Sequence, residues 1–255
     1  MKSLRNCVPI LILLTTAGTQ ASTVLYNNGP FISDPGAGFG GADASVLRDS
    51  MNTYGLNFNT IPNYSIADDF VVPTGEIWDL AGVQFYGYQT NSTLTSTFTS
   101  LNVQIWNGRP GDLGASVIWG NWIDNLLETG TFSGVYRVSS GALTATDRPI
   151  MSLNGALIPT LTAGSYWIQW GTTGSLASGP WAPPITIPGQ STTGNARQYS
   201  NGSWVDANLN PGFQQDFPFQ ILGDVSAVPE PGSALGTLLL IGSAFGVRVR
   251  PRRRS

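Results

Sequence analysis

The chain has 255 residues, of which 41% are hydrophobic and 11% are charged, and its formal net charge is −3. It contains no histidine, and its one cysteine is Cys7. These counts exclude intrachain disulfide bonds, histidine-based catalytic triads and zinc sites with the usual ligand sets.

The N-terminal segment, residues 1–21, has the pattern of a secretory signal peptide. Lys2 and Arg5 form a basic n-region, and Cys7–Leu14 is a short apolar core. Thr19 and Ala21 place small residues at the −3 and −1 positions of a cleavage site. The apolar core is too short to span a membrane, so the pattern predicts export and removal of this segment.

Residues 22–226 are predicted to form one extracellular β-domain. Apolar and polar residues alternate over short runs separated by Gly, Pro, Asn, Ser and Thr, which is typical of strands and turns. A segment of this length can bury one core without disulfide bonds. The predicted strands are Thr23–Tyr26, Tyr64–Val72, Ile77–Gln89, Leu101–Trp106, Ser116–Trp119, Val135–Ser139, Ser165–Trp170 and Phe217–Leu222.

The turns of this domain favour an all-β fold. Asn201-Gly202 predicts a tight hairpin turn between Gln198–Ser200 and Ser203–Val205. Only Trp122–Leu127 has a helical pattern, which predicts a single helical turn. About nine short strands with long loops rich in glycine and proline are typical of an antiparallel β-sandwich of jelly-roll type.

The charge of the predicted domain differs from that of the whole chain. Residues 22–227 hold five arginines and 14 acidic residues, which gives a net charge of −9. A protein of this charge is repelled by phosphate backbones, so nucleic acid is not an expected partner.

Two groups of oxygen ligands are candidates for a calcium site, and no other cofactor is expected. Asp68 and Asp69 precede a strand, and with loop carbonyls they are one candidate for binding calcium. Neighbours in a strand face opposite sides, so the two side chains do not easily bind one ion. The alternative is that one aspartate caps backbone N–H groups while the other points to water or an arginine. Asp206, Asn208 and Asn210 have the alternate spacing that opens an EF-hand loop. The later EF-hand positions are not met, which leaves a looser calcium loop or a plain turn.

The eight tryptophans suggest carbohydrate binding as an alternative function. Trp119 and Trp122 near a strand end, and Trp204, are expected to be exposed. Trp181, in a proline-rich segment, is the best candidate for a glycan contact. Aromatic residues in strands more often serve packing. A glycoside hydrolase using carboxylates alone is a third hypothesis, but Glu76 and Glu128 are the only glutamates of the domain and no carboxylate pair has a recognisable spacing. No enzymatic activity is expected.

The C-terminal segment, residues 227–255, has the pattern of a membrane anchor. Gly232–Val247 carries no charge and would be roughly 24 Å long as a helix, somewhat short of a bilayer core. A basic end would hold the C-terminus in the cytoplasm and leave the domain on the other side. The alternative is a buried C-terminal helix with a basic tail. The basic residues are Arg248, Arg250, Arg252, Arg253 and Arg254.

The same segment resembles the PEP-CTERM sorting signal of Gram-negative bacteria. The resemblance rests on Val228, Pro229, Glu230 and Pro231, followed in order by the uncharged segment and the arginines. It implies a single transmembrane helix and recognition by an exosortase-type membrane protease. It also implies delivery to the cell surface or the exopolysaccharide matrix.

The domain itself resembles a recurrent bacterial extracellular β-sandwich that is found with anchoring signals. The resemblance rests on Ala67–Pro73, Gly164–Trp170 and Phe217–Gly223, and it carries no activity. The sequence therefore predicts an exported, envelope-sorted and non-catalytic protein. Its expected role is structural or adhesive, and a polysaccharide is the candidate ligand.

Overall fold

The computed structural model describes residues 22–47, 53–185, 194–208 and 215–228. Over these residues the protein is all-β, with thirteen strands, no α-helix and one three-residue 3-10 helix at Phe39–Gly41. No helix within this part of the chain is long and apolar enough to cross a membrane. The strands are β1 (Thr23–Asn27), β2 (Asp43–Leu47), β3 (Leu56–Asn57), β4 (Ser65–Gly87), β5 (Phe98–Trp106), β6 (Val117–Asn121), β7 (Leu127–Ser139), β8 (Pro149–Ala156), β9 (Thr160–Gly174), β10 (Trp181–Ala182), β11 (Arg197–Ser200), β12 (Ser203–Asp206) and β13 (Phe219–Ala227).

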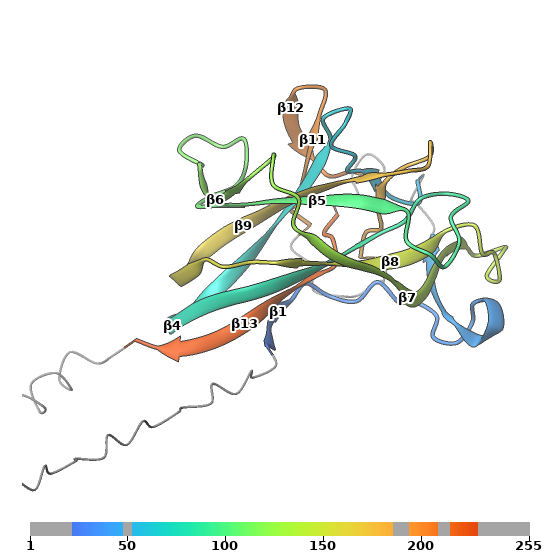
Figure 1. Ribbon diagram of the computed structural model, residues 1–255, viewed down its shortest axis with the longest axis horizontal. Coiled ribbons are helices and arrows are strands. Elements are labelled where there is room, and N and C mark those ends of the chain that lie inside the picture. Colours follow the sequence, from blue (N-terminus) through green and yellow to red (C-terminus); the bar gives the residue numbers. More distant parts are fainter. Residues whose placement is uncertain (1–21, 48–52, 186–193, 209–214, 229–255) are drawn as a thin grey trace, which may run out of the picture.

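The long strand β4 organises the main sheet (Figure 1). Its first part pairs with β11 and β9, and its last part pairs with β13 and β8. The ladder to β9 shifts register between Val72 and Ile77, where Pro73 lacks an N–H donor and Gly75 has a φ of 88°. Two sets of strands therefore share β4, in the orders β6-β5-β9-β4-β11-β12 and β2-β7-β8-β4-β13-β1.

Side chains from both sets of strands fill one core, as expected for a sandwich-like protein. Phe85 of β4 stacks on Trp170 of β9 with ring centroids 4.5 Å apart. Phe219 of β13 contacts both rings, and Tyr26 of β1 packs against Phe70 of β4. These aromatic contacts join the two sets of strands around a common apolar interior.

Most predicted strands are confirmed within a few residues, with two informative differences. Tyr64–Val72 and Ile77–Gln89, predicted as two strands, form the single strand β4. The predicted helical turn at Trp122–Leu127 is wrong, because the side-chain oxygen of Asn121 accepts the N–H groups of Ile123 and Asp124 and makes a turn there.

The predicted hairpin is confirmed, whereas the prediction of a wholly antiparallel fold is wrong at one edge. Asn201 and Gly202 have φ values of 52° and 83°, as a tight hairpin turn between β11 and β12 requires. Strand β2, however, pairs parallel to β7. These two strands are far apart in the sequence, so no short turn fixes their relative direction.

Candidate functional site

The register of β5 on β9 places large polar and aromatic side chains on one face of the sheet. Gln104 is opposite Gln169, and Trp106 is opposite Trp167. Opposite residues share a face, and side chains alternate along a strand. All four side chains therefore lie on the face opposite to that of Ile168, which belongs to the core.

The hairpin β11–β12 extends the same face beyond β4. Ala67 of β4 is opposite Gln169, and Ser65 of β4 is opposite Tyr199 of β11. Tyr199 in turn is opposite Trp204 of β12. Figure 1 shows this hairpin beside the start of β4, near β5 and β6. One continuous face thus runs across β5, β9, β4, β11 and β12.

A hollow of about 220 Å³ opens on this face, and we call it the aromatic–amide cleft. Asn63 precedes β4, and Trp122 follows β6, so two loops also contribute side chains to the lining of the cleft. The complete lining is Asn63, Gln104, Trp106, Trp122, Gln169, Tyr199 and Trp204.

Hydrogen bonds fix the floor of the cleft. Gln169 is only 3% exposed, and its Oε1 accepts the indole N–H of Trp106 at 2.9 Å. Its Nε2 donates to the hydroxyl of Ser65 at 2.8 Å. The Gln169 amide and the Trp106 ring are therefore held in place before any ligand arrives, which lowers the entropic cost of binding.

Aromatic contacts fix the wall of the cleft. Trp204 packs edge-on against Trp106 at 6.1 Å and against Tyr199 at 5.3 Å between ring centroids. Both geometries are among the favoured arrangements of aromatic pairs. Trp204 is half-buried, so part of its surface is left for a ligand.

Two arginines attach a loop to the outside of this wall. Oδ1 of Asp206 accepts Arg109 Nη2 at 2.6 Å and Arg197 Nη1 at 2.9 Å. The Arg109 guanidinium also lies 5.9 Å from the ring centroid of Trp167. Gly111, in the same loop as Arg109, packs so closely on Trp204 that an added Cβ would lie 2.8 Å from that side chain. The predicted calcium ligand Asp206 is thus the counter-ion of two guanidiniums.

The lining of the cleft suits a neutral, polyhydroxylated ligand. It offers three amides and a phenol as hydrogen-bonding groups, and three indole rings as flat apolar surfaces. No carboxylate, lysine or arginine belongs to the lining. Such a surface can bind a ligand by stacking and hydrogen bonding.

Asp68, the first predicted calcium ligand, lies in the interior instead. It is fully buried, and its Oδ2 accepts Nδ2 of Asn28 and the N–H of Phe217, both at 2.8 Å. Its Oδ1 accepts the N–H of Asp69 at 2.9 Å. The carboxyl group therefore joins β1, β4 and the segment before β13, which fits the capping role that was the alternative to calcium.

Burial dominates the electrostatics around Asp68. Loss of hydration, and then the charge of Asp216, raise the pKa of Asp68 well above its ordinary value, although the N–H groups of Phe217 and Asp69 oppose this shift. Burial, and then the charges of Asp69, Asp68 and Asp216, raise the pKa of Tyr26 to about 12. Tyr26 donates its hydroxyl hydrogen to Asn28, so it belongs to the same network.

The other calcium candidates do not converge on Asp68 or Asp206. Asp69 is half-buried on the opposite face of β4 from Asp68, Asn208 is exposed, and Asn210 lies outside the described residues. In the part of the chain that the structure describes, no three His, Cys, Asp or Glu side chains are grouped to hold a metal ion. Calcium binding at these positions stays a prediction.

Trp181, the predicted glycan contact, lines a second hollow of about 160 Å³. Trp181 is half-buried, and its indole N–H is 3.4 Å from the hydroxyl of Ser178. Its backbone exchanges two hydrogen bonds with Tyr88 at the end of β4. We call this hollow the Trp181 pocket, and its lining is Thr53, Tyr54, Tyr88, Thr90, Arg148, Ser178 and Trp181.

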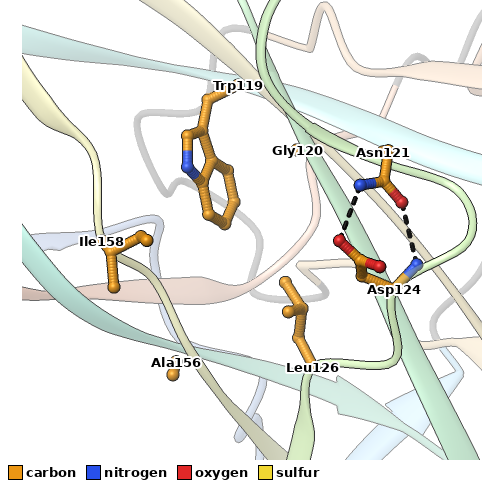
Figure 2. Close-up of a pocket in the computed structure, with 7 residues that line it drawn as sticks. All are labelled: Trp119, Gly120, Asn121, Asp124, Leu126, Ala156 and Ile158. Carbon is orange, nitrogen blue, oxygen red and sulfur yellow. Dashed lines mark hydrogen bonds between the residues drawn. The ribbon is translucent and has the colours of Figure 1, made fainter.

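A third hollow, of about 340 Å³, is mainly apolar. Figure 2 shows Trp119, Leu126 and Ile158 around it, with Asp124 turned toward Asn121. Asn121 donates to the Asp124 carboxylate at 2.7 Å and accepts its N–H at 2.8 Å. Its nearest polar groups are therefore occupied, and its lining contains one amide, whereas the lining of the aromatic–amide cleft contains three.

The predicted sorting signal lies almost entirely outside the described residues. Val228 is its one described residue; it is half exposed, and its N–H donates to the carbonyl of Gly75 at 3.1 Å. Pro229, Glu230, Pro231 and the five C-terminal arginines fall outside that part, as do residues 1–21. The predicted export and sorting signals therefore stay predictions.

Comparison with known proteins adds no relative. No family model matches the chain, and no curated protein sequence matches it.

Sequence reasoning missed most of the aromatic–amide cleft. It named Trp181 as the best glycan contact and expected Trp122 and Trp204 to be exposed, but it did not bring these two rings together with Trp106 and the amides of the cleft. A usable signal was the alternation in β9, which puts Gln169 and Trp167 on the face away from the core. A large amide between aromatic residues on a non-core face is a reason to expect a ligand site.

Proposed function

We propose that this protein is a non-catalytic polysaccharide-binding protein with an adhesive role. The observation that carries this proposal is the aromatic–amide cleft, where the amides of Asn63 and Gln104 lie beside indole rings and the buried Gln169 amide holds the Trp106 ring in place. Sugars offer hydroxyl groups to amides and flat apolar faces to aromatic rings. A cleft without charged lining groups favours neutral sugar residues.

The place of action that we propose is the envelope or the exopolysaccharide matrix of a Gram-negative bacterium. This part rests on the signal-peptide pattern of residues 1–21 and on the resemblance of residues 228–254 to the PEP-CTERM sorting signal. The proposal includes a jelly-roll sandwich, a C-terminal transmembrane helix before processing and an exosortase-type protease as partner. The mass of the protein recovered from cells tests both cleavages at once.

Glycan binding is tested with the purified exported protein on an array of neutral and acidic oligosaccharides. The best neutral ligand is then titrated by calorimetry against the wild type and Trp204→Ala. We expect the substitution to weaken binding at least 10-fold, about 1.4 kcal/mol, because half of the aromatic wall is lost.

Trp119→Ala is the matched control, because Trp119 is also a half-buried tryptophan but lines the apolar hollow. It should bind the neutral ligand within 2-fold of the wild type. Equal affinity of folded Trp204→Ala and wild type, or an array with no neutral ligand, would contradict the proposal.

A further inference from the structure

A buried guanidinium without a carboxylate partner lies behind the Trp181 pocket. Arg137 of β7 is fully buried, and its Nε donates to the carbonyl of Tyr54 at 2.7 Å. Its Nη1 reaches the carbonyl and hydroxyl of Ser45 at 3.4 and 3.2 Å, and its Nη2 has no hydrogen-bond partner. Among the described residues, no carboxylate lies within 4 Å of Arg137.

The guanidinium of Arg137 keeps its charge at neutral pH although it is fully buried. Burial lowers the pKa of Arg137 to about 10, which still leaves the group protonated near pH 7. A buried cation with only neutral acceptors is costly, and it produces a positive potential in the space around it. Tyr54, whose carbonyl Arg137 binds, lines the Trp181 pocket.

A second guanidinium forms part of the pocket wall. Arg148 lies 4.0 Å above the ring of Tyr54 and pairs with Asp147 at 2.9 Å. Its backbone carbonyl accepts the N–H of Arg137, so the two arginines are neighbours on paired strands. Asp147 is the one described carboxylate that pairs with either of them, which leaves an excess positive charge.

The rest of the pocket offers groups that suit a sugar. Trp181 gives a half-buried ring, and Thr53, Thr90 and Ser178 contribute hydroxyl groups. Tyr88 also lines the pocket; the charges of Arg137 and Arg148 oppose the rise that burial causes in the pKa of its hydroxyl, so both guanidiniums act on this space. A volume of about 160 Å³ is below that of a drug-sized site and suits one small residue or group.

We propose that the Trp181 pocket binds an acidic sugar residue of a polysaccharide, with Arg148 contacting its carboxylate or sulfate group and the Trp181 ring stacking on its apolar face. A planar guanidinium pairs well with either anion. The excess positive charge is the feature that separates this pocket from the aromatic–amide cleft, whose lining is neutral.

The inference deepens the proposed function, on which it rests for the assumption that the ligand is a glycan. The domain carries a net charge of −9, so it repels polyanions at a distance. Binding of an acidic polymer therefore requires a local positive site. At about 0.15 M salt the long-range repulsion is largely screened, since the Debye length is about 8 Å.

The test is affinity electrophoresis and calorimetry of the whole exported protein at 0.15 M NaCl with polygalacturonate, dextran sulfate and uncharged dextran. We expect polygalacturonate to bind at least 10-fold more tightly than dextran. Arg148→Gln should lose at least 10-fold of that affinity, and Trp181→Ala should weaken it as well. Asp147→Asn, which removes the competing carboxylate, should bind more tightly than the wild type.

The outcomes separate the two ideas. An Arg148-dependent preference for dextran sulfate over polygalacturonate supports the pocket and assigns a sulfate ester as the anion. Equal affinity of Arg148→Gln and wild type, or no preference for either acidic polymer over dextran, overturns the inference. If the neutral ligand of the cleft still binds in that case, the proposed function stands; if no glycan binds at all, both fail.

Discussion

Asp68 offers a sharp test of the reasoning about buried polar groups, through the substitution Asp68→Ala. The change removes the acceptor of three donors: the side-chain amide of Asn28 and the backbone N–H groups of Asp69 and Phe217. A buried donor left without a partner costs about 1–3 kcal/mol. The substitution also removes the cost of burying a carboxylate, which offsets part of the loss from the three donors. We therefore expect a net loss of about 3 kcal/mol in the free energy of unfolding at pH 7.

Asp68→Asn removes the titrating group but keeps one of its two acceptor oxygens, so the pH dependence of its stability reports the charge. Because the pKa of Asp68 is raised in the folded protein, the folded state binds more protons than the unfolded state between the two pKa values. The stabilisation from this group is therefore fully present below its ordinary pKa near 3.8, and it is lost as the pH rises through the folded pKa. Asparagine does not titrate, so the wild type should lose stability relative to Asp68→Asn as the pH increases.

The assay is urea unfolding followed by tryptophan fluorescence between pH 3 and pH 8 for the wild type and both variants. The difference in unfolding free energy between wild type and Asp68→Asn cancels most other titrating groups. A difference that is constant with pH, or that grows in favour of the wild type at high pH, would refute the raised pKa. A loss below 0.5 kcal/mol in Asp68→Ala would refute the role of the three donors.

Two further substitutions test the cleft and its supports by the same unfolding assay, and a third tests the close approach of β6 to β5. Asp206→Ala removes the shared counter-ion of two arginines. Because the Asp206 side chain is 39% exposed, we expect a loss of about 1–2 kcal/mol in the free energy of unfolding, and an unchanged value would contradict the role of Asp206 in holding both arginines. Trp106→Phe keeps an aromatic ring but leaves the buried side-chain oxygen of Gln169 without its donor. The change should lower the free energy of unfolding by about 1–2 kcal/mol and weaken binding of the neutral glycan. Gly120→Ala should cost about 3 kcal/mol or more, because Gly120 has a φ of 83° and its added Cβ would meet a backbone carbonyl of β5; a stable variant would contradict the close approach of β6.

The sequence was sufficient to predict an all-β protein, because the evidence for strands is local. Alternation along β5 and β9, and the turn at Asn201-Gly202, are properties of neighbouring residues, and these elements are confirmed. The parallel pair β2–β7 and the short strand β10 depend on contacts between distant segments. No local pattern contains that information.

The candidate site could be predicted only in part, for the same reason. Alternation in β9 placed Trp167 and Gln169 on the other face of the strand from Trp170. It gave no sign that other residues cover this second face as well. Gln169 is nearly inaccessible because Trp106 and Ser65 hold its amide, and these partners come from β5 and β4. The spacing of Asp206 predicted a metal ligand, whereas Asp206 binds Arg197 and Arg109, and Arg109 is 97 residues away in the sequence.

The position of the cleft bears on how an anchored protein would present it. Thr23 of β1 is paired with Gly223 of β13, so the first and last described strands lie side by side. In Figure 1 the end of β13 and the hairpin β11–β12 are on opposite sides of the described structure. If the proposed C-terminal anchor follows Val228, the cleft next to the hairpin is directed away from the attachment point. A polysaccharide could then reach the Trp106 and Trp204 rings without competing with the membrane, which is the arrangement that an adhesive protein requires.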